Sequence, residues 1–254
     1  MNSSNALKNS VLADVSALPL RTAETIESWG KTLVVAPHPD DESLGCGGAI
    51  ALLRRFEIPV SVLTMSDGTL SHPNSKQFPA AVLRDLRERE MLAALKILGV
   101  AEKNATFLRF KDRSVPDDAS TDFAAAIEIC SKYLHAVKPQ TVLLPWRRDP
   151  HPDHRASTRI IFEATKSLSV KPKILEYPVW IWELAETADA PRIEEVCAFR
   201  LDIGAAVRQK QAAIRAHESQ TTDLIADDPH GFRLTPEILA HFAEPFEIYL
   251  ESIL

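Results

Sequence analysis

Short apolar runs alternate with longer amphipathic segments along most of the chain. Runs rich in β-branched residues and leucine predict buried strands at residues 31–37, 59–66, 105–110, 140–146, near 173–180 and 196–201. Apolar residues at helical spacing between these runs predict helices at residues 44–56, 78–100, 120–137, 153–168 and 203–218. The C-terminal tail predicts one more helix and a strand at the edge of the sheet.

This alternation indicates the fold class. Helices of ten or more residues between strands indicate crossover connections, and therefore a mostly parallel sheet in an α/β fold. Residues 1–30 predict an N-terminal extension, and residues 31–254 a single domain. In open parallel sheets, ligands bind beyond the carboxyl ends of the strands. Two clusters of polar residues follow the predicted strands at 31–37 and 140–146, so both lie at such ends.

Size and charge narrow the class of protein. The chain has 254 residues, 45% of them hydrophobic, so it can bury one sizeable core. A formal net charge of −6 argues against a general nucleic-acid-binding protein, which usually carries a basic face. No run approaches the roughly 18 apolar residues of a membrane span, and the N-terminus lacks the pattern of a secretory signal, so we expect a cytoplasmic protein. Cys46, Cys130 and Cys197 form no CxxC pair, which predicts buried, reduced thiols.

The two polar clusters contain the residue types of an open zinc site. His38 and Asp41 stand three residues apart after the first strand, and His151, Asp153 and His154 follow a later one. Two imidazoles and one carboxylate leave a fourth position for water at a catalytic zinc ion, which lowers the pKa of that water to about 7. A neighbouring carboxylate then accepts the proton.

Each cluster also has a purely structural interpretation. Asp40, Asp41 and Glu42 stand where a helix begins, and acidic residues there interact favourably with the helix dipole. His151 and His154 would then be surface histidines in a proline-bounded loop. The occurrence of both clusters at strand ends favours the metal site over two separate coincidences.

These motifs resemble those of a known family. PHPDDESLGCGG, residues 37–48, resembles the HPDDE signature of the PIG-L/LmbE-like deacetylases, and HPDH, residues 151–154, resembles their second metal motif. Segments 84–100 and 210–220 are similar to two further family motifs, through Arg87, Glu90, Leu98, Gly99, Lys210, His217, Ser219 and Gln220. The similarity extends over most of residues 31–220.

The resemblance implies a Rossmann-like three-layer sandwich with a mostly parallel sheet. It also implies a zinc-dependent hydrolase that removes the N-acetyl group from an N-acetylglucosamine-type sugar or glycoconjugate. By motif position, the metal ligands are His38, Asp41 and His154. Fe²⁺ fits the same ligands as an alternative to Zn²⁺. The implied partner is a small amino-sugar or glycoconjugate substrate, with no nucleic acid and no membrane span, and an oligomer is compatible with the sequence.

The same resemblance implies roles for the neighbours of the metal. Asp40 acts as general base on the water, and His151 stabilises the oxyanion, most effectively as an imidazolium. Asp153 orients His151 and favours its charge. Arg87 reaches toward the substrate, and its structural alternative is a solvent-facing charge on a helix. For His217 we favour a structural role, such as capping the end of a helix.

Two other functions fit parts of the pattern. An amidase that cleaves a larger amide, such as a thiol conjugate, fits the same motifs. A non-catalytic module that binds a sugar or a nucleotide fits the fold. The presence of Asp40, His151 and Asp153 beside all three metal ligands argues against that module. Residues 146–149 are expected at the rim of the site.

Overall fold

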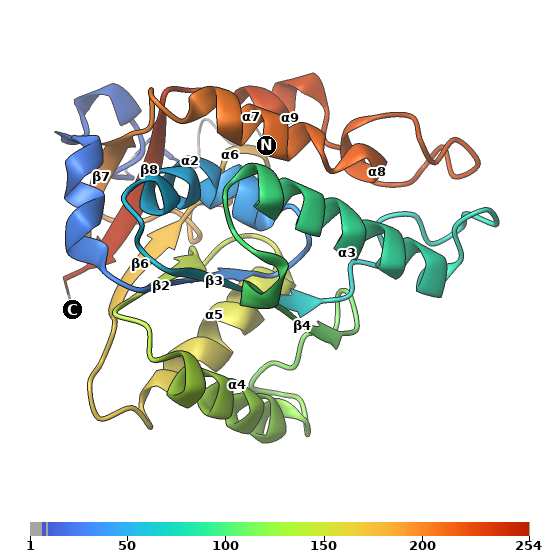
Figure 1. Cartoon of the computed structure of the whole chain (residues 1–254), viewed down its shortest axis with the longest axis horizontal. Helices are drawn as coiled ribbons and strands as arrows, with labels where there is room; N and C mark the ends of the chain where they lie inside the picture. The colour runs from blue at the N-terminus through green and yellow to red at the C-terminus, as the bar shows by residue number, and fades with distance from the viewer. Residues whose placement is uncertain (1–6, 9, 254) are drawn as a thin grey trace.

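The computed structural model describes residues 7–8 and 10–253 and places the strands of that part of the chain in one eight-stranded sheet (Figure 1). Their order is β1-β7-β8-β6-β5-β2-β3-β4. The strands are β1 (Leu20–Arg21), β2 (Thr32–Ala36), β3 (Val60–Ser66), β4 (Ala105–Phe110), β5 (Thr141–Pro145), β6 (Lys173–Tyr177), β7 (Val196–Asp202) and β8 (Phe246–Ser252). Neighbouring strands pair in parallel, except that β8 is antiparallel to both β6 and β7.

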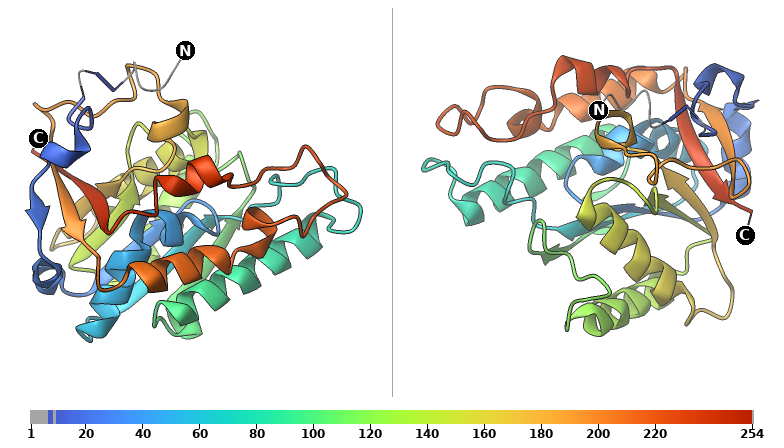
Figure 2. Two further views of the ribbon diagram at one scale, coloured as in Figure 1. Left: turned by 90° about the horizontal axis from the view of Figure 1, so that it is seen from above. Right: turned by 180° about the vertical axis from the view of Figure 1, so that it is seen from behind.

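Helices cover both faces of the sheet, as Figure 1 and the two views of Figure 2 show. One face carries α2 (Asp41–Arg55), α3 (Ala80–Ile97) and α7 (Val207–Arg215), and the other carries α4 (Phe123–Val137) and α5 (Pro152–Thr165). The shorter helices are α6 (Ile181–Leu184), α8 (Glu218–Thr221), α9 (Pro236–Ala240) and the 3-10 helices η1 (Val15–Ala17), η2 (Ala23–Trp29) and η3 (Glu102–Asn104). The predicted three-layer sandwich with a mostly parallel sheet is confirmed. No helix in the described part of the chain is both long and apolar enough to cross a membrane.

The central strands are apolar throughout because their side chains alternate between two cores. Val34 and Ala36 of β2 pack in the core that contains α2, α3 and α7 residues. Leu33 and Val35 of the same strand pack in the core that contains α4 and α5 residues. A strand buried on both faces therefore reads as a continuous apolar run.

The order of the strands creates a switch point between β2 and β5. From β2 the chain continues to β3 and β4 on one side, and it later returns to β5 and β6 on the other. Because β2 and β5 are parallel neighbours, their carboxyl ends, at Ala36 and Pro145, lie at the same edge of the sheet. Ligands of open α/β sheets bind in the crevice at such a point. Both polar clusters of the sequence begin there.

The sequence predicts an edge strand in the C-terminal tail, and this prediction is wrong. β8 lies between β7 and β6, and the edge strands are β1 and β4. The tail occupies an interior position because β8 pairs with the whole of β7, from Val196 opposite Ser252 to Asp202 opposite Phe246. Its consecutive residues Tyr249 and Leu250 point to opposite faces and are both fully buried.

The N-terminal segment packs against the sheet. Leu20 and Arg21 form the edge strand β1, which pairs with β7. Ile26 and Trp29 are fully buried in the core. We keep residues 31–254 as the proposed domain and residues 1–30 as the proposed extension, of which Ile26 and Trp29 add to the core.

Candidate metal centre and active site

The turn after β2 is closed by its own side chain and backbone groups. The carboxylate of Asp41 accepts a hydrogen bond of 2.9 Å from the backbone N–H of His38. The carbonyl oxygen of Asp40 accepts hydrogen bonds of 3.0 Å from the N–H groups of Ser43 and Leu44, as α2 begins. Asp40 has a φ of 144°, a backbone conformation that residues other than glycine rarely adopt. The structure therefore maintains a strained turn at the position of the predicted general base.

The three predicted metal ligands meet around one carboxylate oxygen. Oδ2 of Asp41 lies 3.3 Å from Nδ1 of His38 and 3.2 Å from Nε2 of His154. The two imidazole ring centroids are 5.4 Å apart, and all three side chains are buried. Neither ring nitrogen of His154 makes a hydrogen bond of good geometry. Two segments far apart in the sequence thus present their ligands to a common point.

A further carboxylate lies behind each imidazole. Nε2 of His38 lies 3.1 Å from Oδ2 of Asp153 and 3.4 Å from Oδ1 of Asp112. Nδ1 of His154 lies 3.4 Å from Oδ1 of Asp149. Metal-binding histidines commonly donate the N–H of their outer nitrogen to a carboxylate, which orients the ring. Both rings have such a partner on the side away from Asp41.

In the described part of the chain, two groups of possible ligand atoms lie within 4.8 Å of one another: those of His38, His151 and His154, and those of His38, Asp112 and Asp153. Two imidazole nitrogens and one carboxylate are the donor set of an open zinc site, and the unpaired nitrogens of buried His154 agree with it. Burial lowers the pKa of His154, but the charges of Asp41 and Asp149 raise it to about 9. Conversely, burial raises the pKa of Asp41, but His154 and His38 hold it well below its usual range. A cation therefore has to displace a proton when it binds His154.

Asp40 places a second carboxylate beside the ligands. Burial raises the pKa of Asp40 to about 6, although the guanidinium of Arg87, 3.0 Å from Oδ2, acts in the opposite direction. Such a carboxylate is deprotonated at neutral pH and still basic enough to accept a proton, which suits a general base.

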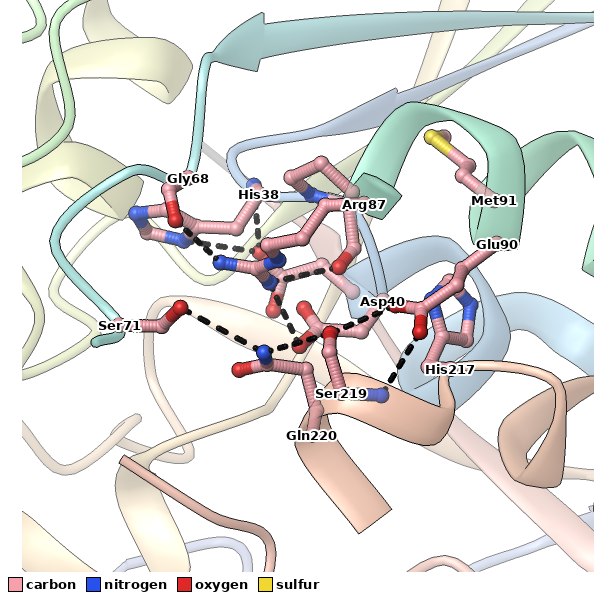
Figure 3. A network of polar contacts seen from close by, with 12 residues as sticks. His38, Asp40, Gly68, Ser71, Arg87, Glu90, Met91, His217, Ser219 and Gln220 are labelled. Atoms are coloured by element: carbon pink, nitrogen blue, oxygen red, sulfur yellow. Dashed lines mark hydrogen bonds and ion pairs between the residues drawn. The ribbon is translucent and has the colours of Figure 1, made fainter. Parts of the chain in front are cut away.

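Arg87 of α3 is buried beside this carboxylate. Its Nη1 donates to the carbonyl oxygen of Gly68 at 2.9 Å, and its Nη2 donates to that of Pro39 at 2.7 Å, as Figure 3 shows for Gly68. Only 3% of the residue is exposed, which excludes the alternative of a solvent-facing charge. The guanidinium connects the strained turn to the loop after β3.

His151, the N-cap residue of α5, has a neutral ring in this structure. Its Nδ1 accepts a hydrogen bond of 3.2 Å from the backbone N–H of Asp153, so the ring hydrogen is on Nε2. Burial and the nearby charges of His154 and His38 lower the pKa of His151 to about 3. The imidazolium expected from the sequence is therefore disfavoured. Asp153 orients His151 through this backbone N–H, while its carboxylate contacts His38.

Three residues that follow α7, namely His217, Ser219 and Gln220, lie close to the site, as Figure 3 shows. Nε2 of His217 lies 3.0 Å from Oε1 of Glu42, close to the start of α2. Ser219 donates from its N–H and its hydroxyl to the carboxylate of Glu90 on α3, at 2.7 and 2.6 Å. All five residues are buried. The side chain of His217 makes no helix-capping hydrogen bond, so its structural role differs from the one we expected.

The sequence prediction omits one carboxylate of the site and misplaces another. Asp112 follows β4, and the strand-end rule that located the other clusters also applies there. Asp149 is expected at the rim but is fully buried. Its oxygens accept hydrogen bonds of 3.0 Å from the N–H groups of His151 and Trp180. Since Trp180 comes from a later segment, local sequence does not reveal this burial.

A cavity of about 180 Å³ opens onto the site. His38, Asp40, Asp41, Arg87 and His151 line it, together with Asp112. Four more lining residues share an apolar side chain and are here called the apolar wall: Leu70, Trp180, Leu184 and Phe232. The cavity thus joins the candidate catalytic groups to an apolar surface.

Comparison with known proteins is consistent with this site. Residues 33–165 match the PIG-L family, described as GlcNAc-PI de-N-acetylase. The chain is 28% identical over 222 residues to a probable N-acetyl-alpha-D-glucosaminyl L-malate deacetylase 2 of Bacillus subtilis, covering 85% of this chain and 95% of that protein. It is 29% identical over 220 residues to the diacetylchitobiose deacetylase of Thermococcus kodakarensis, covering 81% of this chain and 76% of that protein.

Solved structures share the fold. The N,N'-diacetylchitobiose deacetylase from Pyrococcus horikoshii aligns with a TM-score of 0.65 at 21% identity, over 96% of this chain and 90% of that one. The 4-carboxy-2-hydroxymuconate hydratase from Pseudomonas putida aligns with a TM-score of 0.64 at 19% identity, over 88% and 96%. A hydratase on the same fold shows that the reaction has to be argued from the site.

Proposed function

Because this chain belongs to the PIG-L (GlcNAc-PI de-N-acetylase) family, we propose that it removes the N-acetyl group from an N-acetylglucosamine-type sugar or glycoconjugate. Its relatives named as deacetylases of amino-sugar compounds support hydrolysis of this bond. The observation that carries the proposal is the pair of imidazoles, His38 and His154, facing one carboxylate oxygen of Asp41.

The proposal includes a divalent cation held by His38, Asp41 and His154. Zn²⁺ is the expected ion, and Fe²⁺ fits the same donors. When bound, such a cation supplies a water of lowered pKa and polarises the acyl oxygen. The carboxylates of Asp153 and Asp149 lie 3.1 Å and 3.4 Å from the outer nitrogens of His38 and His154, where their charges favour this orientation of the rings.

Asp40 moves the protons in this proposal. Its carboxylate accepts a proton from the attacking water and then gives that proton to the leaving amine nitrogen. The ion pair with Arg87 keeps the carboxylate in place. Because Arg87 lines the same cavity, we also assign to it a contact with the substrate.

His151 stabilises the carbonyl oxygen as a neutral donor. Since Nδ1 is occupied by the N–H of Asp153, Nε2 carries the hydrogen that is donated to the developing oxyanion. Because the pKa of His151 is lowered to about 3, the ring is neutral at neutral pH.

The state of the three cysteines is relevant to the proposed cellular location. Cys46 and Cys130 are buried as predicted, whereas Cys197 is exposed, so the expectation that all three are buried is wrong. All three thiols are free, which supports our proposal of a cytoplasmic location. We propose a small amino-sugar substrate as the partner, and we expect no binding of nucleic acid.

Acetate release from N-acetylated sugars and their lipid, nucleotide and thiol conjugates tests this function with the Zn²⁺-loaded protein. We expect turnover of at least one compound, and a loss of about 10²–10⁴-fold in kcat for Asp40→Asn at unchanged zinc content. Full activity of Asp40→Asn would contradict the general-base role. Cleavage only of larger amides would favour the amidase, and no cleavage at all would reject the proposed function.

A further inference from the structure

The apolar wall lies at the mouth of the cavity. Leu184 is 58% exposed, whereas His38 at the catalytic end is 9% exposed. The rings of Trp180 and Phe232 pack edge to face, with centroids 5.5 Å apart and planes at 78°. Half-buried aromatic rings next to a polar site form a preorganised contact surface for a ligand.

Backbone hydrogen bonds tie this wall to the residues around the proposed metal. The N–H of Trp180 donates to Oδ2 of Asp149 at 3.0 Å, and the other oxygen of Asp149 contacts His154. The N–H of Leu70 donates to Oδ2 of Asp112 at 2.8 Å. The distance between wall and reacting centre is therefore held by the same carboxylates that orient the imidazoles.

On the basis of the proposed function, we infer that the apolar wall binds an apolar, preferably aromatic, substituent of the amino sugar. The acetamide has to reach Asp40 and His151, so the rest of the substrate extends toward the mouth. An apolar substituent there leaves water on binding, which favours it.

An anionic substituent such as malate lacks a comparable partner at this cavity. Arg87 is buried at the catalytic end of the cavity, and its charge is paired with Asp40, so its proposed contact is with the acetylated sugar and not with a substituent at the mouth. The other arginine that lines the cavity, Arg113, is exposed, and an ion pair in water contributes little to binding.

The test compares kcat/KM for acetate release from the methyl, phenyl and malyl glycosides of N-acetylglucosamine, using the Zn²⁺-loaded full chain. We expect the phenyl glycoside to exceed the methyl glycoside by about tenfold, and the malyl glycoside to gain nothing. Trp180→Ala should bring the ratio of phenyl to methyl close to one. Trp182→Ala is the matched control two residues further along the chain, because Trp182 stacks on His241 and does not line the cavity.

Several results would overturn this inference. They are equal kcat/KM for methyl and phenyl glycosides, a preference for the malyl glycoside, or a Trp180-dependent preference for a longer acyl group. Calorimetric binding of the three glycosides to Asp40→Asn gives the same comparison without turnover, so a failure of the proposed function is distinguishable. If Trp180→Ala does not fold, Phe232→Leu replaces it.

A second, independent observation concerns the strained backbone of Asp40. Its φ is 144°, and its N–H donates to Oε2 of Glu42 at 3.0 Å. The other oxygen of Glu42 accepts the hydroxyl of Ser43 at 2.6 Å and lies 3.0 Å from Nε2 of His217. Glu42 is fully buried and His217 is 1% exposed.

We propose that Glu42 and His217 are positioning residues for Asp40. Neither lines the cavity, so neither is placed to touch the substrate. His217 holds the buried carboxylate of Glu42, and that carboxylate holds the N–H of the strained residue. Without this support the turn can relax to an ordinary φ, which moves the Asp40 carboxylate away from Arg87.

His217→Leu tests this role. We expect kcat to fall by about 10–100-fold, as for other residues that orient catalytic groups, while KM and bound zinc stay unchanged. His217→Gln keeps a donor near the position of Nε2 and should restore part of kcat. Lys210→Met is the matched control, because it breaks another buried ion pair, that of Lys210 with Glu247 at 2.8 Å. Glu247 contacts α2 at the N–H of Gly48, far along the helix from Asp40.

Three outcomes would contradict the positioning role. They are an unchanged kcat in His217→Leu, an equal loss of kcat in Lys210→Met, or a loss of kcat that follows a loss of zinc. If His217→Leu does not fold, Glu42→Gln gives the same comparison, since the amide nitrogen repels the N–H of Asp40 when its oxygen faces His217.

Discussion

His154 is a fully buried imidazole between two carboxylates, Asp41 and Asp149. Burial lowers the pKa of His154, but these two charges raise it to about 9. The ring is therefore protonated at neutral pH, and the proposed cation has to replace this proton to bind. At the scale of single residues, the two carboxylates that face the ring nitrogens of His154 decide its protonation state.

We expect the affinity of the metal-free protein for Zn²⁺ to increase as the pH rises toward about 9. Below its raised pKa His154 has to lose a proton to bind, which costs affinity at lower pH. Calorimetry in buffers of different ionisation enthalpy counts the protons released. Asp149→Asn lacks one of the two charges and should release fewer protons at neutral pH. An affinity independent of pH would contradict this account.

Arg87→Gln should move the acid limb of the pH profile of kcat/KM to higher pH. The guanidinium favours the charged form of Asp40, against burial, which raises its pKa to about 6. Its removal raises that pKa further, and a general base works only when deprotonated. Arg87→Lys keeps the charge and should move the limb less. An acid limb at the same pH in all three proteins would rule out Asp40 as the group that titrates.

At the scale of elements, small residues let α2 approach the sheet closely. A Cβ at Gly45 would lie 2.2 Å from Cδ2 of Tyr177, and the hydroxyl of Tyr177 donates to the carbonyl oxygen of Val35 in β2 at 2.7 Å. The beginning of α2, which carries Asp41, is therefore held against the strand that precedes the first two proposed metal ligands.

Gly45→Ala should destabilise the protein by about 1–3 kcal/mol, because overpacking against the Tyr177 ring outweighs the gain in helix propensity of about 1 kcal/mol. Urea unfolding measures the change. Gly204→Ala is the control, since a Cβ there meets only Oδ1 of Asp202, at 3.1 Å. Equal stability of the two variants would show that the close approach is not required.

At the scale of the whole molecule, the proposed cation joins two halves of the sheet. His38 and Asp41 follow β2, and His154 belongs to α5, which follows β5. A ligand that binds only the folded state stabilises it, by about 2.7 kcal/mol at a free concentration 100 times Kd.

Zn²⁺ should therefore raise the unfolding temperature of the metal-free protein, and a chelator should reverse the increase. Differential scanning calorimetry measures both. His154→Ala removes one of the proposed ligands, so the same addition of Zn²⁺ should have little effect on that variant. An equal increase in the variant would place the stabilising zinc elsewhere.

The fold class and the two polar clusters could be predicted from the sequence because they depend on local pattern, whereas the proposed metal ligands were assigned by their resemblance to family motifs. Continuous apolar runs predict the parallel strands, which are buried on both faces, and amphipathic segments predict the helices, which are buried on one face. His38, Asp41 and His154 follow strand ends, where parallel sheets gather their ligands. The elements and the polar clusters at strand ends can therefore be predicted without knowing which distant segments are in contact.

Tertiary structure alone decided the features that depend on distant neighbours. The interior place of β8 results from pairing with β7 and β6, which no local pattern specifies. The neutral ring of His151 and the raised pKa of Asp40 follow from burial and from charges brought by other segments. The contact between His217 and Glu42 joins residues 175 positions apart. Periodicity is a property of neighbouring residues, whereas pKa values and buried partners are properties of the packed molecule.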